Sequence, residues 1–293
     1  LGLWEFNETD RLPHGQVVQQ TALISLLDDV TAELATRLVA MLHENQVHIG
    51  FTVNLNITST GCSSSSSSSL ARLFYFDAHA IELAGRKAIV ECPLYDAESG
   101  KQLLLACATF IFVPLNDVAT KIESMVSKEQ QQISNEPLLL SLDDQGTQDI
   151  GASDLHDLSQ VMNFLPHGLV SHKIGSYSAI RQQIAVLVDF GDNLNGPPNH
   201  VHGGILATVL YNASELLLSK TIAGISKQLI SASVRDINYR KGVPTESKDV
   251  FLDAVVEDIS ANSVVILAKL TNGSKVYTTL RTTFTICVPA SKL

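Results

Sequence analysis

An internal repeat constrains the fold of this 293-residue chain more than any other feature of its sequence. In each copy an apolar segment with helical spacing, at residues 22–42 and 205–220, precedes a series of strand-like segments separated by turns. Both copies also end alike, in 109–114 and 283–289, with closing prolines 175 positions apart. We therefore predict a tandem duplication.

In each copy the strands follow the helix, which indicates an α+β fold with an antiparallel sheet rather than alternating βαβ units. Turn residues at 98–101 and 271–274 predict hairpins between the last two strands of each copy. The expected strands cover residues 50–57, 72–83, 87–95 and 102–113 in the first copy, and 229–239, 249–258, 262–271 and 275–288 in the second.

A polar, turn-rich stretch between the copies sets the expected domain boundaries. Residues 116–153 are expected to form a linker, which gives a first domain at 1–115 and a second domain at 154–293. Within the first domain, Ser63–Ser69 is an uninterrupted serine run. Serine side chains bury no apolar area, so this run predicts a loop.

Composition excludes several classes of protein. The formal net charge of -10 argues against non-specific nucleic-acid binding. No apolar run approaches the roughly 18 residues of a membrane-spanning helix, so we expect no transmembrane segment. The 4 cysteines lack CxxC spacing, which argues against a zinc site and indicates reduced thiols. We therefore expect an intracellular protein, cytoplasmic or mitochondrial.

The triplet His202, Gly203 and Gly204 stands directly before the second apolar helix. Glycines at a helix N-terminus present backbone N–H groups and the positive end of the helix dipole, which suits a polarised carbonyl oxygen. Tight packing around a buried histidine explains the same residues without any chemistry. Both interpretations stay open from spacing alone.

Asp28 and Asp29 interrupt the first apolar helix near its middle. Burying a carboxylate is costly unless it is paired or used, and one of two adjacent helix positions must face the buried side or its edge. Alternatively, both carboxylates lie on a solvated rim.

The segment 202–210, together with the strand 50–58, resembles the hotdog-fold acyl-CoA thioesterases of the phenylacetyl-CoA thioesterase type, and the resemblance extends over both copies. In such enzymes a sheet wraps a central helix, and two hotdogs share active sites across their interface. The resemblance implies a double hotdog, with two antiparallel sheets each wrapped around a long central helix and packed as an intramolecular pseudo-dimer. It also allows a homodimer of double hotdogs.

Matching the family pattern to each copy yields one complete site and one degenerate site. The family's catalytic acid, nine residues after the histidine, matches Tyr211 in the second copy and Asp28 in the first. Its water-positioning hydroxyl matches Thr52 in the first copy but Ala232 in the second, and residues 19–21 replace the His-Gly-Gly triplet in the first copy. Family sites draw the glycine loop from one partner and the acid and hydroxyl from the other, so the intact parts combine across the two copies.

The resemblance implies hydrolysis of an acyl-CoA or related thioester. Asp28 would act as general base or nucleophile, Thr52 would orient water, and the N–H of Gly203 or Gly204 would polarise the carbonyl. The expected catalytic residues are Asp28, Thr52, His202, Gly203 and Gly204. The expected substrate-binding residues are Asn195, Asn199, Asp29, Arg240 and Lys241. No metal or cofactor is implied, since CoA enters only as part of the substrate.

Within the substrate-binding set, Asn195 or Asn199 would position the thioester together with His202. Arg240 and Lys241, and Arg235 as a further candidate, would contact the CoA phosphates. The alternative for these cations is ordinary surface solvation.

Two other functions remain open. One is a non-catalytic hotdog module that binds acyl groups or a protein partner, since each copy has lost part of the family pattern. The other is a hydratase on the same fold, which would need a histidine–acid pair in a different context; His14 and His167 lack such a context.

Overall fold

The computed structural model describes most of the two repeats. The described residues are 2–5, 17–43, 47–60, 73–115, 147–151, 170–191, 194, 196, 199–222, 230–245 and 247–286. The serine run, His14, His167, Asn195 and most of the expected linker lie outside them. Within the expected linker, Thr147–Asp149 forms a short strand, and the domain boundaries stay a prediction.

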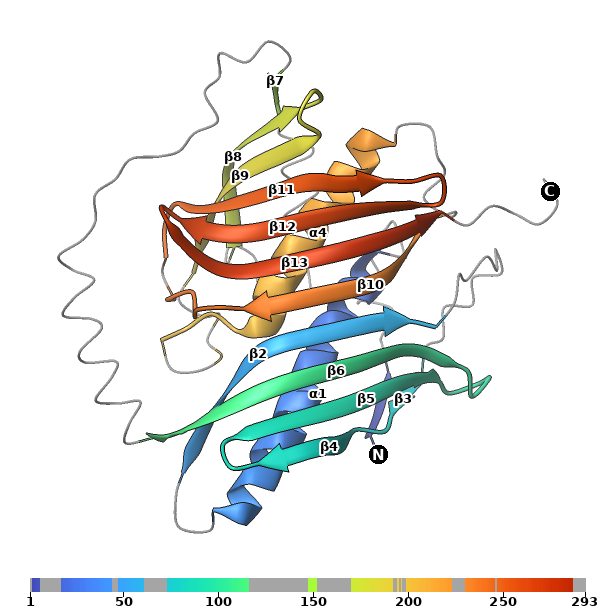
Figure 1. The fold of residues 1–293 in the computed structure, drawn as a ribbon, viewed down its shortest axis with the longest axis vertical. Coiled ribbons are helices and arrows are strands. Elements are labelled where there is room, and N and C mark those ends of the chain that lie inside the picture. Colours follow the sequence, from blue (N-terminus) through green and yellow to red (C-terminus); the bar gives the residue numbers. More distant parts are fainter. Residues whose placement is uncertain are drawn as a thin grey trace.

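Each of two long helices is followed by the strands that the sequence predicts, but strands that it does not predict, at 2–5, 147–149, 170–178 and 183–190, precede the helices (Figure 1). The helices are α1 (Val17–Leu42) and α4 (Gly203–Thr221), where the periodicity predicts them. The first-half strands are β1 (Gly2–Glu5), β2 (His48–Ser59), β3 (Leu73–Phe76), β4 (His79–Ala84), β5 (Lys87–Asp96) and β6 (Gln102–Pro114). The others are β7 (Thr147–Asp149), β8 (Val170–Ser178), β9 (Gln183–Phe190), β10 (Ile230–Tyr239), β11 (Val250–Ile259), β12 (Ser263–Asn272) and β13 (Lys275–Ile286).

Local chemistry explains the hairpins and one departure from expectation. Gly100 and Gly273 adopt positive φ values of 69° and 56° in the turns before β6 and β13, a conformation that glycine adopts without strain. The expected strand 72–83 is instead two strands that pair with β5 in one register. The break at 77–78 lies opposite Pro93, which accepts a hydrogen bond from the Asp77 N–H but has no N–H to donate in return.

The strands form one continuous 13-stranded sheet, in the order β1-β3-β5-β6-β2-β10-β13-β12-β11-β9-β8-β7 with β4 also on β5. The expectation of two separate sheets is corrected, because β2 of the first half pairs antiparallel with β10 of the second. Asn54–Thr58 lies opposite Val234–Asn238 in this ladder, which joins the halves edge to edge.

Both helices pack on the same side of this sheet and contact each other (Figure 1). Ser25 on α1 and Thr208 on α4 share a hydrogen bond of 3.3 Å between their hydroxyl oxygens. These residues are 183 positions apart, the spacing of matching helix positions in the two copies. The two copies of the helix therefore cross at equivalent points.

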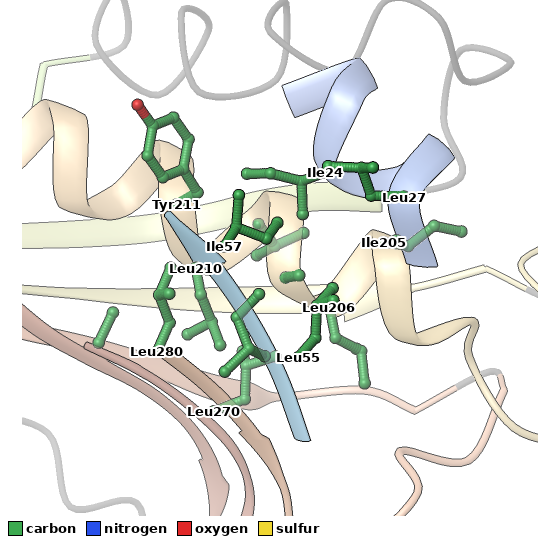
Figure 2. Close-up of a cluster of buried hydrophobic side chains, with 14 of the residues drawn as sticks. Ile24, Leu27, Leu55, Ile57, Ile205, Leu206, Leu210, Tyr211, Leu270 and Leu280 are labelled. Carbon is green, nitrogen blue, oxygen red and sulfur yellow. The ribbon is translucent and has the colours of Figure 1, made fainter. Parts of the chain in front are cut away.

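The hydrophobic core belongs to both halves. Figure 2 shows Ile24, Leu27 and Leu55 of the first half beside Leu206 and Leu210 of the second. These side chains are at most 2% exposed. Burial of apolar area on this scale is the main stabilising contribution to a folded domain, so a large part of the core exists only when the halves are together. Among the described helices, none is long and apolar enough to cross a membrane.

Candidate active site

Asp28 is a buried carboxylate near the middle of α1. Its side chain is 2% exposed, because α1 packs against β2 and against α4. Its Oδ1 accepts a hydrogen bond from the Thr52 hydroxyl at 3.1 Å. Burial raises the pKa of Asp28, although His202, the Thr52 hydrogen bond and the Gly204 N–H each favour the charged form.

His202 is the N-cap of α4 and lies between two carboxylates of α1. Its Nδ1 accepts a hydrogen bond from the Gly204 N–H at 3.1 Å and lies 3.8 Å from Oδ2 of Asp28. Its Nε2 lies 2.9 Å from Oδ1 of Asp29. Burial is the largest influence on the His202 pKa and lowers it, but the hydrogen bond to Asp29 and the two negative charges together outweigh burial and raise it.

The glycine pair at the start of α4 has two different surroundings. A Cβ on Gly203 would lie 3.0 Å from Oδ2 of Asp28, so the backbone there borders the carboxylate directly. A Cβ on Gly204 would lie 2.9 Å from the Cα of Ser25, so this glycine permits the close approach of α1. Among the described residues, none accepts a hydrogen bond from the Gly203 N–H, whereas the Gly204 N–H is bound to His202.

The structure thus brings together the five residues expected to be catalytic. Asp28 and Thr52 come from the first half, and the triplet 202–204 comes from the second. The arrangement presents a buried carboxylate, a hydroxyl and a helix N-terminus around one point, which suits attack on a polarised carbonyl. Their catalytic roles stay predictions. Within the described ranges, no group of three histidine, cysteine or acidic side chains could hold a metal ion.

The residues expected to bind substrate are distributed around this point rather than gathered at it. Asp29 contacts His202. Asn199 is exposed and has a positive φ of 61°, and its carbonyl accepts a hydrogen bond from the Thr245 N–H. Arg240 and Lys241 are exposed at the end of β10, directly after Tyr239, whose ring borders Gly203. Asn195 lies outside the described residues.

The sequence analysis missed Tyr239. Its hydroxyl donates a hydrogen bond to the Gly203 carbonyl at 3.1 Å, and its ring would lie 3.3 Å from a Cβ at that glycine. Burial, with a smaller effect from Asp28, raises its pKa well above the ordinary value. Tyr239 therefore holds the first turn of α4 in place. A tyrosine at the end of an alternating strand gives no sequence signal for such a contact.

Two β-bulges identify the equivalent positions of the halves independently of the sequence match. The β2–β6 ladder shifts register between Thr52 and Asn54, just after the pair of Thr52 with Phe110. The β10–β13 ladder shifts between Ala232 and Val234, just after the pair of Ala232 with Phe284. Ala232 therefore occupies the position of Thr52 in the second half, where no hydroxyl is available.

A different cluster of side chains lies at the degenerate site, where the second half places its match for Asp28. Tyr211 replaces the acid, is 1% exposed and donates a hydrogen bond to Glu215 at 2.8 Å. The guanidinium of Arg235 lies 4.9 Å from the centre of the Tyr211 ring. Arg235 is itself only 2% exposed, so its expected contact with CoA phosphates is wrong. Its place opposite Thr282 on the inner side of the sheet buries it.

Comparisons with known proteins identify the fold. No family model matches the chain, and no curated protein matches it. Among solved structures, the 12:0-ACP thioesterase from Umbellularia californica is 7% identical, with a TM-score of 0.52 over 97% of this chain and 95% of that one. A Lactobacillus plantarum protein assigned as an oleoyl thioesterase is 11% identical, with a TM-score of 0.50 over 98% of this chain and 96% of the other. Over nearly its whole length, the chain therefore shares the fold of these two proteins, which fits the predicted double hotdog.

Proposed function

We propose that this chain hydrolyses acyl thioesters at one composite site to which each half contributes. The observation that carries the proposal is the meeting of Asp28 and Thr52 from α1 and β2 with His202 and Gly203 at the start of α4. Neither half holds all of these groups. The proposal therefore needs the halves to act as an intramolecular pseudo-dimer with a single active site.

The carbonyl oxygen of the thioester would face the Gly203 N–H and the positive end of the α4 dipole, which stabilise the negative charge of the tetrahedral intermediate. Asp28 would act in one of two ways. It would take a proton from water held by Thr52 while the water oxygen attacks the carbonyl carbon, or it would attack that carbon itself. In both routes the carbon–sulfur bond breaks and the thiolate leaves as the thiol after taking up a proton. In the second route water then hydrolyses the acyl–Asp28 anhydride, which releases the carboxylic acid and regenerates the Asp28 carboxylate.

The fold and two exposed cations near the site support a proposal for the substrate class. The two solved structures with this fold are described as thioesterases, one of them for a 12:0 acyl group on acyl-carrier protein. We propose an acyl-CoA as the substrate here, since Arg240 and Lys241 are exposed cations directly after Tyr239 and would meet its phosphates.

Thiol release from a panel of acyl-CoAs tests the proposal. Asp28→Asn should lower turnover by a factor of about 100 or more, the scale expected for a general base or nucleophile. Tyr211→Phe at the equivalent position should leave turnover within about twofold, because Tyr211 faces Arg235 and Glu215 instead of the site. Equal effects of the two substitutions would contradict the single-site assignment. Absence of wild-type turnover on every thioester would leave a module that binds acyl groups or a protein partner.

A further inference from the structure

Two successive carboxylates on α1 bracket the imidazole of His202. Asp28 is buried on the Nδ1 side, whereas the Asp29 side chain is 62% exposed and lies on the Nε2 side. Successive helix residues point about 100° apart, which lets neighbours in sequence reach opposite edges of one ring. The titratable groups that face this ring are Asp28 and Asp29 on α1, with Tyr239 on β10 contacting the adjacent Gly203.

The hydrogen bonds assign the tautomer of His202. An imidazole nitrogen that accepts a hydrogen bond carries no proton, and Nδ1 accepts from the Gly204 N–H at 3.1 Å. In the neutral ring the proton is therefore on Nε2, which donates to Oδ1 of Asp29 at 2.9 Å. The single lone pair of Nδ1 is thereby engaged, and Oδ2 of Asp28 lies 3.8 Å from the same nitrogen.

We propose that Asp29 is a positioning residue that acts through His202, holding the imidazole in the Nε2–H tautomer and making it the acceptor for the proton that Asp28 takes up. This inference rests on the proposed function. When water attacks the thioester, its proton passes to Asp28 and then to Nδ1 of His202, which gives up its hydrogen bond with the Gly204 N–H, and the Asp29 carboxylate stabilises the imidazolium. The Nδ1 proton then passes to the thiolate of the leaving group, which leaves Asp28 charged and restores the Nε2–H tautomer of His202.

The second half supports this assignment by contrast. Asn212 stands at the position equivalent to Asp29, directly after Tyr211, and it is 4% exposed. Among the described residues, its amide nitrogen and oxygen have no hydrogen-bond partner. The degenerate position has thus lost the charged neighbour together with the catalytic acid. Only the Asp29 side of this ion pair is exposed, at 62% against 27% for His202, and an exposed carboxylate contributes little to stability through packing. Packing alone therefore gives no reason for the carboxylate at 29.

The test compares Asp29→Asn and Asp29→Ala with Glu33→Gln. Glu33 is an equally exposed acid one turn further along α1, where it pairs with Arg37, so its variant is the matched control. Nitrogen-15 NMR titration reads the tautomer and pKa of His202, with its signals assigned by comparison with His202→Gln. The pH profile of kcat/KM is measured on the acyl-CoA that the wild type hydrolyses fastest.

Both Asp29 variants should lower the pKa of His202, mix its tautomers and reduce kcat/KM by about 10-fold, the scale typical when a partner that orients a histidine is removed. Glu33→Gln should change none of these. An unchanged tautomer and pKa in both Asp29 variants would overturn the inference, and so would unchanged kcat/KM with an altered histidine. If no thioester is hydrolysed by the wild type, the proposed function fails while the titration still decides whether Asp29 controls His202.

Discussion

At the scale of single residues, Asp28 is a carboxylate kept in an apolar environment. The Thr52 hydroxyl, the Gly204 N–H and His202 favour its charged form, yet burial, with a smaller effect from the Asp29 charge, outweighs all three and raises its pKa. Such a group lowers the stability of the folded state at neutral pH, because the charged carboxylate costs more free energy in its buried place than in the unfolded chain. A carboxyl group with a raised pKa is also a stronger base, which is what the proposed reaction requires.

Asp28→Asn should therefore raise stability while it removes activity. The unfolded carboxyl loses its proton near its ordinary pKa of 3.8, and the folded one does so only at higher pH, so wild-type stability falls as pH rises through that interval. The asparagine variant has no such loss. Its melting temperature at pH 7 should exceed that of the wild type by a few degrees, and the difference should disappear below the ordinary pKa. A variant that melts lower at pH 7 would contradict this account of the carboxyl group.

Thr52 gives a second prediction at this scale. Its hydroxyl donates to Oδ1 of Asp28, and this hydrogen bond lowers the pKa of the carboxyl group. Thr52→Val removes it, so that the acidic limb of the pH–rate profile should move to higher pH and kcat should fall by about 10-fold or more, the range for a lost proton-transfer contact. Thr52→Ser keeps the hydroxyl, so its acidic limb and its kcat should stay close to those of the wild type. Ala232→Thr, at the equivalent bulge of the second half, should leave the profile unchanged.

At the scale of elements, the crossing of α1 and α4 determines where the site lies. Alanine has a higher helix propensity than glycine, yet the contact between the two helices leaves no room for it at Gly204. A Cβ there would lie 2.9 Å from the backbone of Ser25, which cannot move without shifting α1. Gly203 therefore fits the functional interpretation of the His-Gly-Gly triplet, and Gly204 fits the packing interpretation.

Gly204→Ala should lower the free energy of unfolding by about 1–3 kcal/mol, as overpacking of a tight contact typically does. Gly203→Ala should instead mainly reduce turnover, because its Cβ would meet the movable carboxylate of Asp28 at 3.0 Å. Denaturant unfolding and thiol release measured on both variants separate the two effects. Loss of stability in Gly203→Ala with unaffected Gly204→Ala would reverse the assignment.

The sequence predicts elements better than it predicts how they pair. Apolar periodicity locates α1 and α4, and turn residues locate the hairpins, because these depend on neighbours in the chain. The joining of β2 to β10 depends on which edge strand of each half has no partner within that half, and no local pattern records that. The site shows the same division. The resemblance predicts Asp28, Thr52 and His202, whereas the contacts of Tyr239 and Arg235 depend on which side chains the completed sheet places against the helices.

At the scale of the whole molecule, the halves are joined by three contacts that all depend on each other. The β2–β10 ladder pairs one edge strand of each half, the α1–α4 contact brings the Ser25 and Thr208 hydroxyls within hydrogen-bond distance, and the shared core fills the space behind them. An unpaired edge strand beside exposed apolar area favours aggregation. The same interface assembles the composite site, so folding of the molecule and completion of the site are one event.

Dividing the chain tests this dependence. The fragment 1–115, expressed alone, should be aggregated or unfolded, because it loses the partner of β2 and the helix that covers α1. Co-expression with 116–293 should give a one-to-one complex that recovers thiol release, since each fragment carries groups the other lacks. The same complex with Asp28→Asn in the first fragment should stay inactive, which shows that recovered activity comes from the composite site. Size-exclusion chromatography, circular dichroism and the thiol assay read these outcomes, and a soluble, monomeric and folded 1–115 would contradict the interdependence of the two halves.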